Sequence, residues 1–173
     1  MDSSVKYHGA VYQMVADTKL LILMRGVSGA GKSTKARQLG GEVFSTDDYF
    51  TNGYDVAALD AAHVWNQRRV ESAMHRSVSP VVVDNTMVQA WEGKPYVDLA
   101  FKNRYQIKIM EPDNDLWRQF RPGMPDDELM DLAQQFAQRG RHGAPVEVVF
   151  KMLKRWEPNL RVIDIMHARR PQF

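Results

Sequence analysis

A glycine-rich segment near the start of the chain has the residue types and spacing of a phosphate-binding loop. The pattern GxxxxGK(S/T) is satisfied within GVSGAGKS by Gly26, Gly31, Lys32 and Ser33. Glycines at these positions let successive backbone N–H groups point inward at phosphate oxygens. The segment lies between an apolar run and a helical pattern, which disfavours the alternative of a purely structural glycine-rich turn with an exposed lysine.

The polar residues that follow the glycines could hold a nucleoside triphosphate such as ATP together with Mg²⁺. Lys32 would bring positive charge to the β- and γ-phosphates, and Ser33 would offer its hydroxyl to the metal ion. A helix that starts here also points the positive end of its dipole at the same anion. The residues predicted to bind the nucleotide are Gly26, Ser28, Gly29, Ala30, Gly31, Lys32, Ser33 and Thr34.

An acidic pair after the next apolar run could serve the acceptor of a phosphoryl transfer. Asp47 lies just beyond EVFS, at the carboxyl end of a predicted parallel strand, and this end would face the phosphate loop. A carboxylate there could take the proton of an attacking hydroxyl, so Asp47 is the candidate base. Asp48 and Tyr49 are predicted to lie beside the acceptor. Alternatively, the two carboxylates cap the helix or turn that starts at this point.

Another carboxylate, Asp84, ends the apolar run VVVD. An acid in this position can hold the coordination shell of Mg²⁺, so Asp84 and Ser33 are the predicted metal-site residues. The alternative role of Asp84 is to cap a helix or turn. Asn85 and Thr86 share the same strand end and are predicted to hydrogen-bond the acceptor, unless they only complete the turn.

Two arginines, Arg139 and Arg141, flank a glycine in QRGRHGAP and could form part of a mobile lid. The transition state of phosphoryl transfer spreads negative charge over the phosphate oxygens, and guanidinium groups delivered by a lid would neutralise that charge. The alternative is an ordinary basic helix C-terminus, which the helix dipole favours. His142, in the same stretch, is predicted to be a surface or capping residue.

Short apolar runs alternate with helical patterns, and this order predicts the elements that position these side chains. Strands are expected at 20–25, 42–45, 80–86 and 105–112, with a possible last strand at 160–166, and helices at 32–39, 55–78, 89–103, 114–120, 125–139 and 146–156. This alternation is typical of the α/β class. We therefore expect the three-layer fold of P-loop NTPases and kinases, with a mainly parallel sheet, helices on both faces and a helical lid.

Two details of the predicted helices bear on packing. The long helix at 55–78 is expected to bury Ala57, Ala61, Val64, Trp65 and Val70. Pro95 is expected to lie within the first turn of its helix, because only there is the missing N–H harmless.

Composition restricts the protein to a few classes. A chain of 173 residues, 44% hydrophobic and 25% charged, is typical of one folded domain rather than a disordered protein. A net charge of +2 is too small for a protein that coats duplex nucleic acid or an anionic membrane, although contact with one nucleic-acid end stays open. The absence of cysteine excludes disulfides and thiolate zinc sites.

The domain organisation follows from the same patterns. We expect an N-terminal arm or extra strand at 1–19, a phosphate-loop domain at 20–156 with its lid around 125–145, and a tail at 157–173. No apolar run approaches the length that crosses a bilayer, and the N-terminus has no signal-peptide hydrophobic region. A cytoplasmic location is predicted, which is the host cytoplasm for a phage-encoded chain. The sequence predicts no oligomeric state.

Several motifs between Leu20 and Trp156 also occur together in a known family. They are RGVSGAGKST, STDDYF, AHVWNQRR, VVVDNT, AWEGKPYVDLA, EPD and RGRHGAP. In these motifs the chain resembles the kinase domain of polynucleotide 5′-hydroxyl kinases and related P-loop kinases of phage and eukaryotic origin. The resemblance implies that Lys32 and Ser33 bind ATP phosphates and Mg²⁺, and that Asp47 activates the acceptor hydroxyl. It also implies that Arg139 and Arg141 form the lid and that Thr86 helps to hold the acceptor nucleotide.

Three departures from the family pattern leave the acceptor open. The family commonly has Asn in place of Met87 and often in place of Gly140, and phage members have an arginine soon after their DDY, where this chain has Phe50 and Thr51. The leading hypothesis is transfer to a hydroxyl of a nucleic acid. The alternatives are transfer to a nucleoside, a sugar, an antibiotic or a hydroxymethylated pyrimidine in DNA, and a nucleotide-binding module that transfers nothing.

Overall fold

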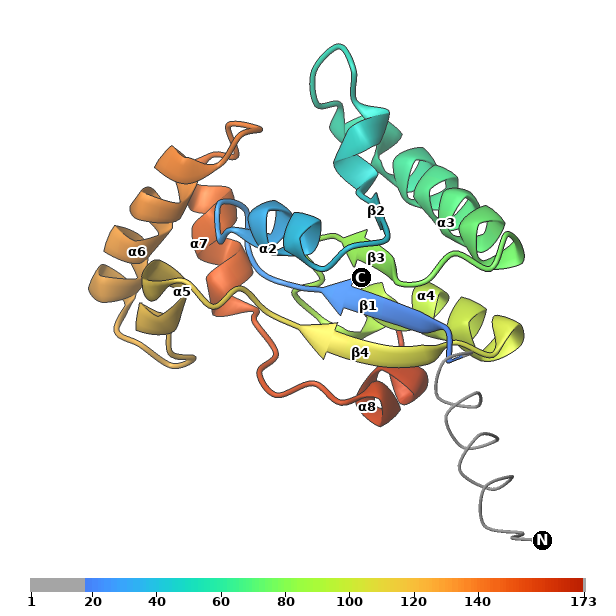
Figure 1. Ribbon diagram of the computed structural model, residues 1–173. Coiled ribbons are helices and arrows are strands. Elements are labelled where there is room, and N and C mark those ends of the chain that lie inside the picture. The colour runs from blue at the N-terminus through green and yellow to red at the C-terminus, as the bar shows by residue number, and fades with distance from the viewer. Residues whose placement is uncertain (1–17, 173) are drawn as a thin grey trace, which may run out of the picture.

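The computed structural model describes residues 18–172, and its centre is a parallel sheet of four strands (Figure 1). The strands are β1 (Leu20–Met24), β2 (Glu42–Phe44), β3 (Val81–Asp84) and β4 (Gln106–Met110). Their order across the sheet is β2-β3-β1-β4, and each neighbouring pair is parallel. Every carboxyl end therefore lies at one edge of the sheet, which is where open α/β folds place their ligands.

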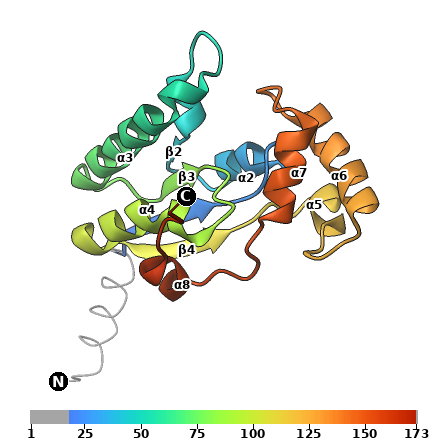
Figure 2. The ribbon, with the colours of Figure 1, turned by 180° about the vertical axis from the view of Figure 1, so that it is seen from behind.

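Helices cover both faces of the sheet, as predicted. They are α2 (Lys32–Gln38), α3 (Leu59–His75), α4 (Ala90–Asn103), α5 (Asp115–Gln119), α6 (Asp126–Arg139), α7 (Val146–Lys154) and α8 (Val162–His167), and two short 3₁₀ turns, η1 (Thr46–Tyr49) and η2 (Val56–Ala58), precede α3. The views from the front and from behind place α2 on one face and α4 and α8 on the other (Figures 1 and 2). Beyond the carboxyl ends of the strands, α5, α6 and α7 form a separate helical group.

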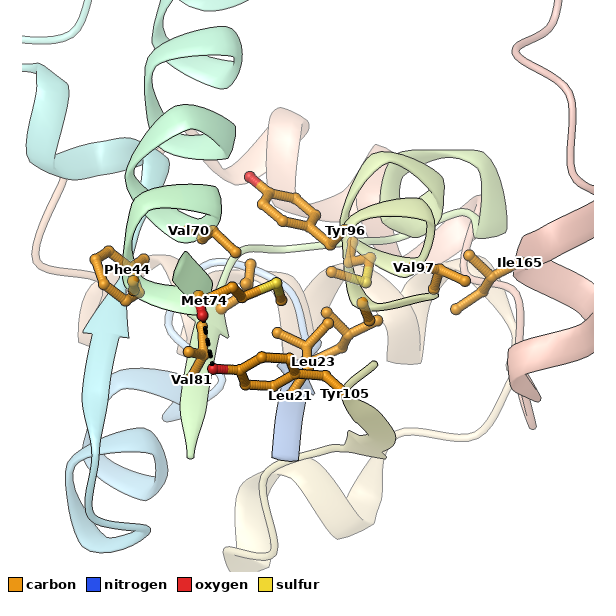
Figure 3. Packing of buried hydrophobic residues seen from close by; sticks show 14 of the residues in the cluster. Leu21, Leu23, Phe44, Val70, Met74, Val81, Tyr96, Val97, Tyr105 and Ile165 are labelled. Carbon is orange, nitrogen blue, oxygen red and sulfur yellow. Dashed lines mark hydrogen bonds between the residues drawn. The ribbon is translucent and has the colours of Figure 1, made fainter. Parts of the chain in front are cut away.

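The main hydrophobic core follows from the two-residue period of the central strand β1. Leu21 and Leu23 point to the face that α3, α4 and α8 cover, where they pack with Val70, Tyr96 and Ile165 (Figure 3). Ile22 and Met24 point to the opposite face and pack with Ala36 of α2. Because alternate side chains of a strand lie on opposite faces, five apolar residues in a row predict a strand that is buried on both sides.

A second hydrophobic cluster joins the helical group to the phosphate loop. Val27 and Ala30 of the loop pack against side chains of α5, α6 and α7, and the buried members from those helices and their flanks are Leu116, Trp117, Leu129, Leu132, Ala133, Phe136, Val149, Leu153 and Trp156. Burial of apolar surface contributes about 25 cal/mol per Å². The helices predicted to form a lid are therefore packed on the loop that they would cover.

The predicted last strand at 160–166 is wrong, because this segment contains helix α8. Its alternation of apolar and polar residues resembles a strand, but Asp164 accepts a hydrogen bond from the backbone N–H of Arg161 at 2.8 Å and caps the helix. Ile165 is fully buried against the core. Residues 157–172 thus pack on the domain, and α8 contacts α4.

Two packing predictions also need correction. Val70 is buried as predicted and Trp65 is half-buried, but Ala57, Ala61 and Val64 are exposed. The other buried residues of α3 are Ala62, Asn66, Ala73 and Met74. Ala62, next to Ala61, is fully buried, so Ala61 and Val64 lie on the outer face of the helix. Pro95 is the sixth residue of α4 rather than part of its first turn.

The predicted N-terminal arm lies almost wholly outside the described residues, which exclude 1–17 and 173. Within 18–172, no helix is both long and apolar enough to cross a membrane.

Candidate active site

The phosphate loop connects β1 to α2 and has the backbone that its glycines allow. Gly29 and Gly31 have φ angles of +79° and +97°, in the left-handed region that residues with a Cβ rarely adopt. The N–H of Gly26 donates to the carbonyl of Thr86 at 2.9 Å, which ties the loop to the end of β3. The predicted nucleotide-binding residues at positions 26–34 lie together in this loop and the first turn of α2.

Lys32 experiences the negative charge of two carboxylates, Asp84 at the end of β3 and Asp47 beyond the end of the neighbouring strand β2. Its ammonium group donates to the carbonyl of Val27 at 3.0 Å. Burial lowers the pKa of Lys32, and the negative charges of Asp84 and Asp47 raise it. One lysine of the phosphate loop is therefore within electrostatic range of both the predicted metal-site acid and the predicted base.

Asp84 fits a divalent cation. The residue is 5% exposed, and its Oδ1 is buried with no hydrogen-bond partner among the described residues. A buried carboxylate oxygen without a partner is costly unless a ligand satisfies it. Residues 18–172 contain no group of three or more acidic or histidine side chains that could enclose a metal. A single acid with the Ser33 hydroxyl is the donor set that suits Mg²⁺ held mainly by phosphates and water.

Asp47 is held beside this loop by a capped turn. Ser45 caps η1 by accepting a hydrogen bond from the N–H of Asp47 at 3.2 Å. The N–H of Thr46 donates to Oδ1 of Asn85 at 3.0 Å, so the turn is also tied to the end of β3. The carboxylate of Asp47 is about half exposed. It is therefore fixed at its backbone and open at its reacting end, as a base requires.

The other predicted acceptor residues make mainly internal contacts. Asp48 pairs with Nη1 of Arg69 at 2.9 Å, in addition to its capping contact with Ser45. Asn85 donates through Nδ2 to the Tyr96 hydroxyl at 3.1 Å. Tyr49 is 39% exposed and packs edge-on against Trp65. The side chains of Tyr49 and Asp48 both keep exposed surface, and Asp48 and Asn85 also brace the turn that carries Asp47.

Arg139 and Arg141 lie at the end of α6 and in the loop that follows it. Both side chains are exposed, and neither has a hydrogen-bond or ion-pair partner in the part of the chain that the structure describes. Arg139 also lines a cleft of about 530 Å³, together with Asn114, Gln119, Gln135 and Gln138. The two guanidinium groups are thus available to a bound nucleotide.

Sequence reasoning missed three residues that build the site. Asn114 caps α5 and donates through Nδ2 to the carbonyl of Ala30 at 2.7 Å, which braces the phosphate loop. Arg25 is fully buried beneath the loop. His142, predicted to be a surface or capping residue, has its Nε2 3.5 Å from Oδ2 of Asp47. The capping preference of Asn before LWRQ could have identified Asn114, but no local pattern indicates the other two contacts.

Two comparisons with known proteins agree with this geometry. Residues 21–119 match the family model described as an AAA domain, a range that includes the phosphate loop, Asp47 and Asp84 and ends before α6. Human NEDD4-binding protein 2 is 39% identical over an alignment of 162 residues, which covers 88% of this chain and 8% of that protein. The chain therefore spans a small part of the length of this relative.

Proposed function

The chain belongs to the AAA domain family of P-loop, kinase-like proteins, and from this premise we propose that it transfers the γ-phosphate of ATP to the 5′-hydroxyl of a nucleic acid. The observation that carries the proposal is that the N–H groups of Thr46 and Gly26 tie the turn of Asp47 and the phosphate loop to the same strand end, the one that carries Asp84. A protein that only binds nucleotide needs the carboxylate of Asp84 for the metal ion but does not need that of Asp47. An exposed carboxylate opposite the phosphate site is what a transfer to a hydroxyl requires.

Each residue would have a defined task in this reaction. The N–H groups of the phosphate loop and Lys32 would hold the β- and γ-phosphates, and Asp47 would accept the proton of the attacking hydroxyl. The bond between that oxygen and the γ-phosphorus forms while the bond from the γ-phosphorus to the bridging oxygen breaks, and ADP leaves. Arg139 and Arg141 would neutralise the charge on the transferred group.

Mg²⁺ would be held by Ser33 and Asp84, the two residues whose chemistry fits it. When bound, it neutralises phosphate charge and orients the γ-phosphate. The partnerless Oδ1 of Asp84 is the support for this assignment in the chain itself.

The cleft beside the phosphate loop offers space for the nucleoside part of the donor. It is lined mainly by side-chain amides, from Asn114 on α5 to Gln135 and Gln138 on α6. The amide of Asn114 is held by its hydrogen bonds to Ala30 and Trp117, but those of Gln135 and Gln138 each present a donor and an acceptor and can rotate to suit different bases. We therefore expect limited discrimination between ATP and GTP.

A second candidate acceptor, a nucleoside or another small molecule, is favoured by the charge of the segment that carries Asp47. Positions 46–60 contain four aspartates, Asp47, Asp48, Asp55 and Asp60, and no lysine or arginine. Arg69 pairs with Asp48, and Arg170 pairs with Asp60. The charge that is left on Asp47 and Asp55 repels a phosphodiester backbone. The exposed rings of Tyr49 and Tyr54 would still accept a single base by stacking.

Transfer of labelled γ-phosphate from ATP tests the proposal and separates the two acceptors. The acceptors to compare are 5′-hydroxyl DNA, 5′-hydroxyl RNA, DNA with hydroxymethylated bases, and free nucleosides. Label on an oligonucleotide end supports the proposal, whereas label on a nucleoside or modified base alone supports the second candidate. ATP binding without transfer to any acceptor would leave a nucleotide-binding module and refute both.

The base assignment has its own prediction. Asp47→Asn should lower the transfer rate by about 10²- to 10⁴-fold, because the acceptor proton loses its recipient, and should leave ATP affinity nearly unchanged. Asp98→Asn is the matched control, because Asp98 is an exposed carboxylate on α4 whose one ion-pair partner among residues 18–172 is Lys94. Full activity in Asp47→Asn would remove Asp47 from the role of base.

A further inference from the structure

One side chain of the lid reaches across the site to the candidate base. His142 lies in the loop between α6 and α7, and its Nε2 is 3.5 Å from Oδ2 of Asp47 in η1. These two elements rise on opposite sides of α2 (Figure 1). Among residues 18–172, His142 is the one side chain that comes within ion-pair distance of the Asp47 carboxylate. The two residues belong to elements that are far apart in the sequence, so this contact forms only when the lid lies close to η1.

The loop that carries His142 is anchored to the phosphate loop at its base. A Cβ on Gly29 would lie 1.8 Å from the carbonyl oxygen of Phe136, so the backbones of α6 and the phosphate loop are in direct contact. A Cβ on Gly140 would lie 3.2 Å from Oγ of Ser28. His142 follows this anchor by two residues. Any movement of the lid away from the phosphates therefore carries the imidazole away from Asp47.

The other ionisable groups around Asp47 act at longer range. Burial lowers the pKa of Lys32 and of His63, and the charge of Asp47 raises both. Burial and the same charge raise the pKa of Tyr54. None of these three side chains hydrogen-bonds the Asp47 carboxylate in the described residues. The orientation of the carboxylate is thus left to His142.

We propose that His142 is a positioning residue that orients Asp47 only when the lid is seated on the phosphate loop. From its ion-pair distance of 3.5 Å, the imidazole would donate from Nε2 to Oδ2, and Oδ1 would be left free to receive the acceptor proton. A base that is held in this way by a third group is pre-organised for proton transfer. This inference rests on the proposed function, and it couples occupation of the donor site to activation of the acceptor.

Substitution of His142 tests the proposal by a graded response. His142→Ala should lower the maximal transfer rate by about 10- to 100-fold and leave the KM for ATP unchanged, because the base loses its orientation but the phosphate site is intact. His142→Gln should recover much of the rate, since its side-chain amide can donate to Oδ2. His75→Ala, an exposed histidine at the end of α3, is the matched control and should transfer at the wild-type rate.

A double-mutant cycle separates action through Asp47 from any other effect. In an Asp47→Asn background, His142→Ala should cause no further loss in single-turnover transfer. A wild-type rate in His142→Ala overturns the proposal, as does a full additional loss in the double variant. Equal loss in the Gln and Ala variants also overturns it.

The contact itself can be tested without any turnover. The ring resonances of His142, assigned by comparison with His142→Gln, should move in Asp47→Asn and stay in place in Asp98→Asn. Unmoved resonances in Asp47→Asn overturn the proposal even where transfer is normal. If the wild type transfers phosphate to none of the acceptors, the proposed function fails, and this measurement alone decides whether the lid holds Asp47.

Discussion

At the scale of single residues, Asp84 combines a stability cost with a functional requirement. Its Oδ1 is buried at the end of β3 and has no hydrogen-bond partner among the described residues. Such a group costs about 1–3 kcal/mol unless something satisfies it. Groups of this kind persist at functional sites because a ligand completes them. Mg·ATP should therefore stabilise the folded protein by more than the phosphate contacts alone explain.

Asp84→Asn tests this reading through thermal stability. We expect the melting temperature of the free protein to change little, because the lower cost of burying a neutral amide is offset by the lost attraction between Asp84 and Lys32. The wild type should gain about 2.7 kcal/mol from Mg·ATP at a concentration of 100 times Kd, and the variant should lose most of that gain. Melting curves with and without Mg·ATP measure both effects. An equal gain in Asp84→Asn would place the metal elsewhere, and Asp98→Asn controls for loss of a surface charge.

The residues of the site differ in how far their roles can be predicted. Gly31, Lys32 and Ser33 are contiguous, so a single sequence motif predicts that they bind phosphate together. Asp47 and Asp84 follow apolar runs, and parallel strands bring their ends together. The contact of His142 depends instead on how a lid packs on a loop more than one hundred residues away. Local patterns carry no information on such a contact.

At the scale of elements, the lid is held to the phosphate loop by close backbone packing. Gly29 has φ +79°, and a Cβ there would overlap the carbonyl oxygen of Phe136. Gly40, after α2, has a nearly equal φ of +74° but nothing within 4 Å of its Cβ position. The two glycines thus share the conformational strain and differ in the contact with α6.

Substituting these two glycines separates strain from packing. Gly40→Ala should cost about 1–2 kcal/mol of unfolding free energy, from the left-handed backbone alone. Gly29→Ala should cost about 1–3 kcal/mol more, because α6 must move away from the loop. It should also weaken ATP binding, which Gly40→Ala should spare. Urea unfolding and nucleotide titration provide the two measurements. If Gly29→Ala and Gly40→Ala lose the same unfolding free energy, α6 can move away from the phosphate loop at no cost.

The same scale separates the elements that can be predicted from those that cannot. β1 and β3 are runs of apolar residues next to glycine or proline, and burial on both faces leaves them no other place than the sheet interior. The segment at 160–166 alternates like an edge strand, yet it is helical because Asp164 caps it and Ile165 enters the core. The periodicity of this segment is compatible with a strand and with a helix, and the packing of Ile165 in the core selects the helix.

At the scale of the whole molecule, one buried arginine joins the sheet, the lid and the C-terminal segment. Arg25 follows β1 and donates to the carbonyls of Met87 at 3.1 Å, Val88 at 3.0 Å and Glu157 at 2.8 Å. Its guanidinium group stacks on Trp156, 3.8 Å from the ring centroid. Burial lowers its pKa to about 10, against the opposing charges of Glu111, Glu157 and Glu92. The charge is kept because a fork of N–H groups satisfies three carbonyls at once.

Arg25→Lys should therefore be far from conservative. A lysine ammonium keeps the charge but cannot reach the carbonyls of Met87, Val88 and Glu157 together, and it loses the planar stack on Trp156. We expect a loss of about 3–5 kcal/mol in unfolding free energy, since breaking a buried charged network leaves its partners unsatisfied. Arg118→Lys, at a 68% exposed side chain on α5, should change stability by less than about 0.5 kcal/mol. Urea unfolding followed by circular dichroism compares the two variants. Equal stability would mean that the two hydrophobic clusters hold the sheet and the lid together without Arg25.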